Sequence, residues 1–228
     1  MKPILFSTPM AQALLNTAPG VWPAAPIDPS KPYKSQTRRV VRYKDKGSGE
    51  DHYIFNMRIS PDVQDAYEVA CEDISGVSNN GIAYGWIFPK YKVGDILWVR
   101  ETFTSDEDRN YIYKADPMFD DCGPGDIGWK WTSPIFMPRK AARLFLEVKS
   151  VRAERLRDIT SKDCIAEGAM ALKKLPDGSL AHGQIFEILA FGQLWDTLNA
   201  KRGYSWESNP WVWVYEFMRV EGGLKWQR

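Results

Sequence analysis

The segment WVWVYEFMRV, residues Trp211–Val220, is the stretch of sequence that decides the fold class. Successive side chains of an extended strand point to opposite sides, so the aromatic residues share one side while Val212, Val214 and Met218 share the other. A strand that is apolar on both sides must be covered on both, as in a small barrel backed by helices. We therefore expect Trp211–Val220 to lie inside a barrel and to pair with a neighbouring strand on each side.

Short strands and a few helices account for most of the remaining pattern. Apolar alternation and strand-forming residues predict strands over residues 3–6, 54–59, 96–99, 111–114 and 144–151. Threonines that can cap helix N-termini and glycines that can end helices predict helices over residues 8–17, 160–168 and 185–203. This combination predicts an α+β domain around a small β-barrel flanked by helices.

A length of 228 residues suits one domain with insertions or two small domains. We expect a single domain over residues 1–228, with loop insertions at about 18–33, 44–92 and 104–128. The first insertion is rich in proline, and the loop at 117–138 is crowded with Gly, Pro and Asp. Long ordered loops in compact domains are usually functional, so we expect these two loops to border the same cleft.

The charge balance limits how this chain can bind nucleic acid. Lys and Arg together number 30 and Asp and Glu 29, which excludes a broad basic surface, so phosphate contacts must come from local clusters. The 10 Trp residues are unusual; several must fill the core, and others suit stacking on a base. Together these features favour a pocket for a single base over a long phosphate-binding track.

Other residue types indicate which cofactors and which cellular compartment to expect. Cys71, Cys122 and Cys164 are odd in number and widely spaced, and His52 and His182 stand alone, so we expect neither a zinc site nor a disulfide framework. We predict no cofactor. The sequence has no signal-peptide pattern and no apolar run near the roughly 18 residues of a membrane span. We expect a cytoplasmic protein, in a bacterium or in its host if a phage encodes it, with no membrane partner and an oligomeric state that the sequence leaves open.

The run KSQTRR, Lys34–Arg39, is the most polar short segment of the chain. It offers an amine, an amide, hydroxyls and two guanidiniums, and two valines follow it. It can be a solvated turn or the wall of a pocket for a planar anionic ligand. Arg38 and Arg39 point to opposite sides if the segment is extended, so one can bind phosphate while the other pairs with Glu101 or Asp95.

A second polar and aromatic run, GDILWVRE, covers residues 94–101. Strand alternation places Trp98 and Arg100 on one face and Glu101 on the other, and a wall of Trp and Arg can stack on a base and hydrogen-bond it. The alternative is a core Trp beside a buried Arg–Glu pair. Arg139, at the end of the long loop, can add a phosphate contact or belong to a solvated basic face.

Five runs occur along the chain in a characteristic order: residues 3–17, 34–41, 93–103, 129–168 and 191–220. This combination resembles the ASCH family of the PUA-like superfamily, in particular its phage- and prophage-encoded members. The resemblance implies a pseudo-barrel with helices at its mouth and a cleft for RNA, DNA or a modified nucleoside. It also implies several possible activities, because some small members look like amidohydrolases that deacetylate acetylated cytidine. Others are linked to ribonuclease activity or to binding without catalysis.

In the amidohydrolase branch the active group is a Lys, a Thr three residues later and a Glu on a later short helix. By resemblance these roles fall on Lys34, Thr37 and Glu167. A Thr hydroxyl becomes a nucleophile when a base takes its proton, a Lys can be that base or stabilise an oxyanion, and a Glu can carry a proton. The alternative is a Lys–Glu ion pair beside a Thr that hydrogen-bonds the backbone.

The chain departs from the family pattern at Pro32, where a Gly is usual, and in its length, about twice that of the minimal amidohydrolases. Three functions remain open. The first is a module that binds nucleic acid or a modified nucleobase. The second is a metal-independent amidohydrolase of an acylated nucleoside, or a nuclease, and the third is a phage structural factor. Convergence of Lys34, Thr37 and Glu167 within hydrogen-bond reach favours an enzyme, and their separation favours a binding module.

Overall fold

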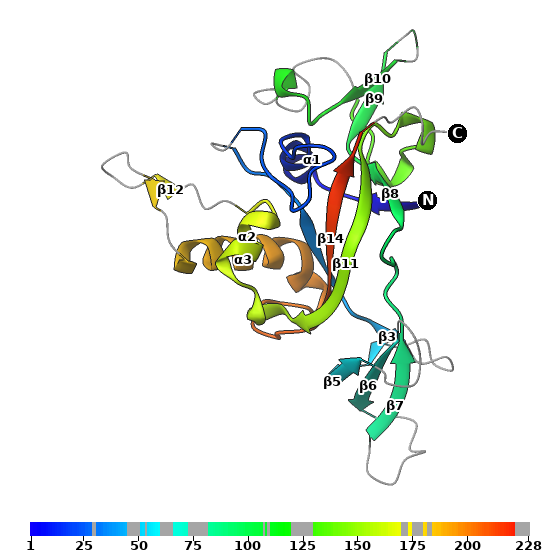
Figure 1. The fold of residues 1–228 in the computed structure, drawn as a ribbon, viewed down its shortest axis with the longest axis vertical. Helices are drawn as coiled ribbons and strands as arrows, with labels where there is room; N and C mark the ends of the chain where they lie inside the picture. Colours follow the sequence, from blue (N-terminus) through cyan, green and yellow to red (C-terminus); the bar gives the residue numbers. More distant parts are fainter. Residues whose placement is uncertain are drawn as a thin grey trace.

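A five-stranded sheet forms the centre of the computed structural model (Figure 1). The structure describes residues 1–28, 31–44, 51–52, 54–59, 66–72, 82–106, 108, 110–119, 130–169, 173–174, 180–181 and 184–221. The strand order of the sheet is β1 (Lys2–Leu5), β8 (Ile96–Arg100), β11 (Phe145–Arg155), β14 (Trp211–Val220) and β2 (Gln36–Val40). Only β1 and β8 run parallel; each of the other neighbouring pairs is antiparallel.

Strand β14 has the bounds that the sequence predicts, and it pairs with β11 on one side and β2 on the other. Trp213, Tyr215 and Phe217 enter the main apolar core, whereas Val212 and Val214 belong to a second core cluster on the opposite side. The prediction of a strand covered on both sides is therefore confirmed. Among the described residues the sheet does not close into a barrel, because β1 and β2 remain its two edges.

In the described part of the chain, three α-helices pack around this sheet: α1 (Thr8–Leu15), α2 (Ser161–Ala166) and α3 (Gln184–Asn199). Helices α2 and α3 contact each other and lie together on one side of β14 (Figure 1). The capping box predicted at Thr160 is present, since its side chain accepts a hydrogen bond from the Asp163 amide while the Asp163 carboxylate accepts one from the Thr160 amide. The expected α+β class is thus correct.

The remaining elements are smaller. A separate antiparallel sheet of β5 (Ile54–Ile59), β6 (Tyr67–Glu72) and β7 (Ile82–Ile87) lies at the far end of the molecule from α1 (Figure 1). Strands β9 (Phe103–Ser105) and β10 (Tyr111–Tyr113) form a hairpin. Two short strand pairs join β3 (Tyr43–Lys44) to β4 (Asp51–His52) and β12 (Lys173–Lys174) to β13 (Leu180–Ala181). The 3₁₀ turns are η1 (Pro117–Phe119), η2 (Pro134–Phe136), η3 (Arg139–Ala141), η4 (Leu156–Asp158) and η5 (Ala200–Arg202).

Strand β11 continues four residues beyond the predicted end at residue 151. Its pairing with β14 shifts register between Val148 and Ser150, which marks a β-bulge. Up to Val148 the even-numbered residues face the main core, and after the bulge Val151 and Ala153 pack against it instead. The extra residue reverses the alternation, and this reversal is why the period-two pattern underestimates the strand.

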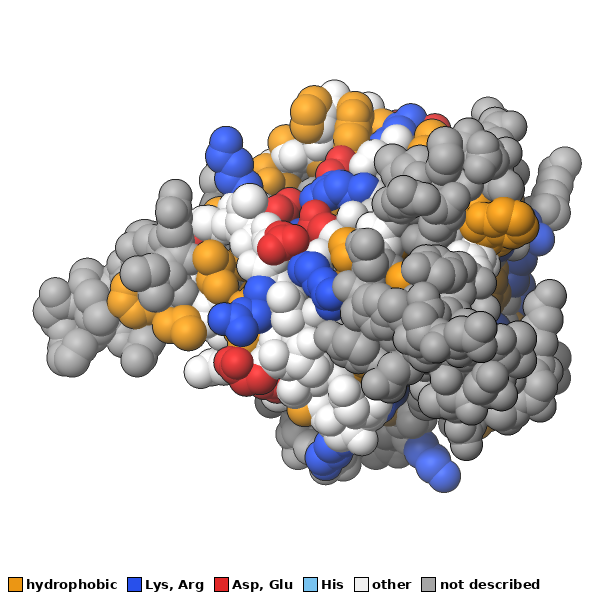
Figure 2. All heavy atoms as spheres, turned by 90° about the horizontal axis from the view of Figure 1, so that it is seen from below, with side chains coloured by type: hydrophobic (Ala, Val, Ile, Leu, Met, Phe, Trp, Pro, Cys, Tyr) orange, Lys and Arg blue, Asp and Glu red, His pale blue; other side chains and the backbone are white. Residues whose placement is uncertain are grey.

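The two edge strands of the sheet approach each other across a gap that we call the β1–β2 seam. The Arg39 side chain of β2 crosses it and donates a hydrogen bond from Nη2 to the Leu5 carbonyl of β1, at 2.8 Å. On the face seen in Figure 2, acidic side chains of the described residues gather near the centre with basic side chains directly beside them. In the described part of the chain, no helix is both long and apolar enough to cross a membrane.

Candidate active site

A cavity of about 760 Å³ opens at the β1–β2 seam. This volume lies within the range of roughly 300–1,000 Å³ that is typical of small-molecule pockets. Its wall comes from the end of β1, from α1, from β2, from the loop before η2, from the residue after α2, from α3 and from η5. The lining residues are Leu5, Phe6, Ser7, Met10, Lys34, Thr37, Arg38, Arg39, Val40, Arg42, Ser133, Pro134, Glu167, Phe191, Leu194, Trp195, Leu198, Asn199 and Arg202.

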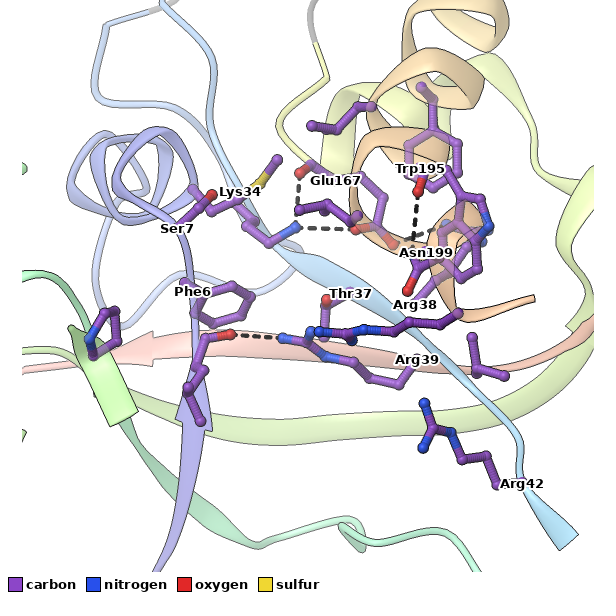
Figure 3. Close-up of a pocket in the computed structure, with 18 of the residues that line it drawn as sticks. Phe6, Ser7, Lys34, Thr37, Arg38, Arg39, Arg42, Glu167, Trp195 and Asn199 are labelled. Carbon is purple, nitrogen blue, oxygen red and sulfur yellow. Dashed lines mark hydrogen bonds and ion pairs between the residues drawn. The ribbon is translucent and has the colours of Figure 1, made fainter. Parts of the chain in front are cut away.

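A buried ion pair between Lys34 and Glu167 forms part of this wall (Figure 3). Lys34 Nζ lies 3.0 Å from Glu167 Oε2 and also donates to the Glu167 backbone carbonyl at 2.7 Å. The two residues are 133 positions apart in the chain and only 1% and 4% exposed. Burial of both charges requires such pairing, because an isolated charge in the interior is costly.

Local structure at the end of α2 places Glu167 against Lys34. Glu167 is the C-terminal cap of α2, and Gly168 follows with a φ of +82°, which turns the chain away. A Cβ at position 168 would lie 3.2 Å from the Ala13 Cβ of α1, so a side chain here would be both strained and crowded. The glycine therefore allows α1 to approach the ion pair closely.

The start of β2 is tied to both neighbouring helices. The Thr17 hydroxyl, just after α1, donates to the Lys34 carbonyl at 2.9 Å and accepts from the Lys34 amide at 3.0 Å. The Ser35 amide donates to the Ala166 carbonyl of α2 at 2.8 Å. These bonds hold the Lys34 backbone between α1 and α2 and direct its side chain toward Glu167. They fix the backbone at Lys34 even though Pro32, and not the glycine expected from the family resemblance, stands two residues before it.

Arg38 supports the other oxygen of Glu167. Its Nη1 donates to Glu167 Oε1 at 3.1 Å, its Nε donates to Glu154 Oε1 at 3.1 Å, and Nη2 lies 3.4 Å from Asp163 Oδ2. Arg152 extends the group by contacting Glu154 at 3.0 Å. Glu167 is thus held between two buried cations, Lys34 and Arg38, and both of its oxygens have donors.

The expected opposition of Arg38 and Arg39 is confirmed, because Arg38 is buried and Arg39 is exposed. The expected partners are wrong. Arg38 pairs with carboxylates from β11, α2 and the α2 cap, whereas Glu101 pairs with Arg143 and Asp95 pairs with Lys2. Sequence distance hides these pairings, since β2 and β11 become close only through β14, the strand between them.

Thr37 lines the same cavity from β2 and is only 4% exposed (Figure 3). Among the described residues, no hydrogen bond joins its hydroxyl to Lys34 or to Glu167. The structure therefore brings all three residues of the expected trio to one cavity, two of them in direct contact. The third faces the space that a ligand would fill.

The four other predicted base-binding residues lie outside this cavity. Trp98 is 6% exposed and packs in a core cluster, with the Arg100 guanidinium 4.7 Å from its ring. Glu101 is fully buried and accepts two hydrogen bonds from Arg143, each at 2.9 Å. Arg139 begins η3. The expected alternative is correct for Trp98, which packs in the core, but not for the ion pair, because buried Glu101 pairs with the half-buried Arg143 and not with Arg100.

The aromatic residues of the cavity are Phe6, Phe191 and Trp195, which the sequence does not single out as ligand contacts. Both Phe191 and Trp195 lie on α3 and also pack in the second core cluster, and apolar residues at helical spacing indicate core packing only. Arg42 and Arg202 are also unpredicted members of the wall. A basic residue just after a strand or in the last turn of a helix is common, so neither position carries a distinguishing signal.

The two loops expected to border one cleft contribute unequally. The loop at 117–138 supplies Ser133 and Pro134 to the cavity wall, but none of the described residues between 19 and 33 lines it. The earlier loop instead packs near the α1 C-terminus, where the Asn16 side chain bonds the Asp28 carbonyl at 2.9 Å and the Lys31 carbonyl at 3.0 Å. The prediction of a shared cleft is therefore wrong for the first loop.

No group of three or more His, Cys, Asp or Glu residues in the described ranges has an arrangement that could hold a metal ion. Cys164 is buried beside the cavity, and burial raises the pKa of its thiol to about 12. At neutral pH it is a protonated, unreactive thiol that packs in the second core cluster. Cys122 and His182 lie outside the described residues.

Burial lowers the pKa of the Lys34 amine below its ordinary 10.5, and this effect outweighs the opposing influence of the Glu167 carboxylate. At pH values just below 10.5 the unfolded chain therefore holds a proton that the folded protein has released. The free energy of unfolding should consequently rise as pH increases toward 10.5. Urea titrations between pH 7 and 10 on the parent and on Lys34→Met isolate this contribution, and the parent should gain stability relative to the variant. A difference that is constant or shrinks with pH contradicts the assignment.

Comparison with known proteins gives no match, whether to protein-family models, to curated proteins or to solved structures. The resemblance to the ASCH family thus rests on the five sequence runs. Function must be argued from the chemistry of the cavity.

Proposed function

We propose that this protein is an amidohydrolase that removes an acyl group from the exocyclic amine of a nucleobase. The observation that carries the proposal is the meeting of Lys34, Thr37 and Glu167 at one cavity, with Lys34 and Glu167 3.0 Å apart. These are the residue types that a base-activated nucleophile, its base and a proton carrier require.

The hydrogen bonds of Lys34 suit the role of a base. A charged ammonium has three N–H donors, and a neutral amine has two and one lone pair. The backbone carbonyl and Oε2 of Glu167 accept two hydrogen bonds from Nζ, which accounts for both donors of the neutral form. The remaining position is then a lone pair, which can accept the Thr37 proton once the hydroxyl turns toward it. The lowered pKa of the amine makes this neutral form easier to reach from the charged form that pairs with Glu167.

The reaction proceeds through an acyl-enzyme. The Thr37 hydroxyl oxygen attacks the amide carbonyl carbon while its proton passes to Lys34 Nζ. The C–N bond breaks, and the leaving nitrogen receives that proton through the Glu167 carboxylate. Water then attacks the Thr37 ester while Lys34 Nζ takes one of its protons. The bond between the acyl carbon and the Thr37 oxygen breaks, that oxygen receives the proton from Lys34, and a carboxylic acid is released. One water is consumed, the amide becomes an acid and an amine, and Thr37 is restored.

The cavity also suits a base as the leaving group. Phe191 and Trp195 from α3 and Phe6 from the β1 end supply apolar and aromatic wall, which favours a planar ring. A PUA-like barrel is part of this proposal. Two features support it: β14 is buried on both sides, and Arg39 connects the two edge strands across the β1–β2 seam. We place the activity in the cytoplasm.

The test incubates the protein with a panel of N-acylated nucleosides, nucleotides and oligonucleotides and follows products by mass spectrometry. Glu167→Gln should lower kcat by roughly a hundredfold or more, because an amide keeps the shape of the side chain and cannot carry a proton. Glu207→Gln is the matched control, since the Glu207 side chain is 81% exposed and is not part of the cavity wall. Unchanged turnover in Glu167→Gln would contradict the assigned role.

Binding of a base without chemistry is the second candidate. One observation favours it: Glu167 is held by both Lys34 and Arg38, as expected of a structural ion pair, while the Thr37 hydroxyl contacts neither Lys34 nor Glu167 in the described structure. If the parent binds members of the panel through cavity residues but releases no acid from any, this second function replaces the first.

A further inference from the structure

Three guanidiniums at the cavity lack acidic partners. Arg39, Arg42 and Arg202 all line the cavity and have exposed side chains, although the surrounding protein lowers the pKa of the Arg39 guanidinium by desolvation. Within the described part of the chain none of them forms a salt bridge with a carboxylate. Lys34 and Arg38 behave differently, because both are buried and paired with acids. The cavity thus has a deep wall whose charges are matched and an outer wall whose charges are not.

The charge inside the cavity is therefore positive. Glu167 is the one carboxylate among the lining residues that the structure describes, and Lys34 and Arg38 already bind its two oxygens. The three outer guanidiniums form no salt bridge with Glu167, which acts on Arg39 only at longer range. The whole chain has a formal net charge of only +1, so this concentration is local. A cavity with three unmatched cations favours an anionic ligand.

Two of these arginines are positioned by aromatic rings. The Arg39 guanidinium lies 5.4 Å from the centre of the Phe6 ring and uses one N–H to bond the Leu5 carbonyl (Figure 3). The Arg42 guanidinium lies 5.4 Å from the centre of the Tyr204 ring. A guanidinium has five N–H donors, so most remain available to a ligand. Planar donors held on rings match the oxygens of a phosphate.

We propose that Arg39, Arg42 and Arg202 form a phosphate subsite, and that the ligand of this cavity is a phosphorylated nucleoside. The phosphate can be the monoester of a mononucleotide or the diester of a nucleic-acid strand. The substrate class named here rests on the proposed amidohydrolase function. The subsite itself rests only on the three arginines.

The kinetic experiment compares three forms of one substrate: an N4-acylated cytidine, its 5′-monophosphate and a short oligonucleotide that carries it. Either phosphorylated form should have a kcat/KM about 10- to 100-fold above that of the nucleoside, the factor expected for one or two charge-assisted hydrogen bonds. A higher value for the monophosphate identifies the monoester, and a higher value for the oligonucleotide identifies the diester. Equal values for all three forms overturn the subsite.

Substitutions test which residues carry the preference. Arg39→Gln, Arg42→Gln and Arg202→Gln should each reduce the ratio of kcat/KM for nucleotide over nucleoside, and the triple variant should bring it close to one. Arg157→Gln is the matched control, since Arg157 is an exposed arginine outside the cavity that pairs with Glu207 at 3.5 Å. It should keep the parent ratio. A triple variant with the parent ratio overturns the proposal.

A binding measurement separates this proposal from the proposed function. In calorimetric titration, cytidine 5′-monophosphate should bind the parent about 10- to 100-fold more tightly than cytidine, and the triple variant should lose this difference. A parent that binds the monophosphate this way but hydrolyses nothing retains the subsite and loses the amidohydrolase. A parent that hydrolyses nucleoside and nucleotide equally retains the amidohydrolase function and loses the phosphate subsite. Equal binding of the two ligands, or no measurable binding of the monophosphate, overturns the subsite.

Discussion

Thr37→Ala is expected to reduce turnover of an acylated base by about a thousandfold or more, because it removes the only hydroxyl assigned to attack the amide. The folded protein should persist. Thr37 is a β2 residue that pairs with Tyr215 through backbone, and its loss removes one hydroxyl and one methyl group from a nearly buried position. The free energy of unfolding should fall by about 1 kcal/mol. Single-turnover kinetics and urea titration measure the two effects.

Thr37→Ser is the decisive companion to this variant. It keeps the hydroxyl and removes the methyl group, so it should retain a substantial part of the activity that Thr37→Ala loses. It should also accumulate an acyl-serine that mass spectrometry of the intact protein can detect. Equal activity of Thr37→Ala and Thr37→Ser would show that the hydroxyl is not the nucleophile.

Glu167→Ala is expected to be the most destabilising single substitution at the cavity. It leaves Lys34 and Arg38 facing each other without the carboxylate that now contacts both, at 3.0 Å and 3.1 Å. Removing one partner from a buried ion pair typically costs about 3–5 kcal/mol. Urea unfolding at pH 7 should show a loss in this range, and the loss should shrink at higher pH as Lys34 releases its proton.

A second variant separates lost charge pairing from lost volume. Lys34→Met/Glu167→Ala removes one of the two orphaned cations, so it should be less destabilising than the sum of the two single substitutions. Glu207→Ala, at an exposed ion pair, should change stability by less than about 1 kcal/mol. A loss below about 1 kcal/mol in Glu167→Ala itself would mean that water reaches both cations and replaces the carboxylate.

Local signals in the sequence predict the elements well. The bounds of β14, the capping box at Thr160 and the left-handed glycines that end α2 and η5 all depend on neighbours within a few residues. The length of β11 is underestimated because its bulge reverses the alternation midway. Strand β6 (Tyr67–Glu72) lies where the sequence shows no clear period, and pairing with β5 and β7 determines it instead.

The site is predicted only in part, because its walls depend on strand order. Alternation correctly places Trp98 and Arg100 together, since their groups lie 4.7 Å apart, but it cannot say which part of the sheet meets a cavity. The sheet order puts β1 and β2 at opposite edges, and the cavity forms where those edges meet. Lys34 and Thr37 lie at the β2 edge, whereas Trp98 lies on β8, the strand next to the β1 edge. The family resemblance singles out Lys34 and Thr37 as site residues, whereas the hydrophobic period of the sequence singles out neither of them.

The β1–β2 seam has a mechanical consequence for ligand choice. Among the described residues, the hydrogen bond from Arg39 to the Leu5 carbonyl is the one polar contact that connects these two strands. Opening the cavity would therefore break a side-chain bond and leave every strand ladder of the sheet intact. Apolar packing then supplies the resistance to opening, because Phe6 is buried in the main core and the Lys34 amine and Arg39 guanidinium each lie 5.4 Å from the centre of its ring. The bulk of an acyl group should be limited by how far Phe6 can move, whereas selectivity among ligands of similar size should depend on the charged and hydrogen-bonding groups of the cavity.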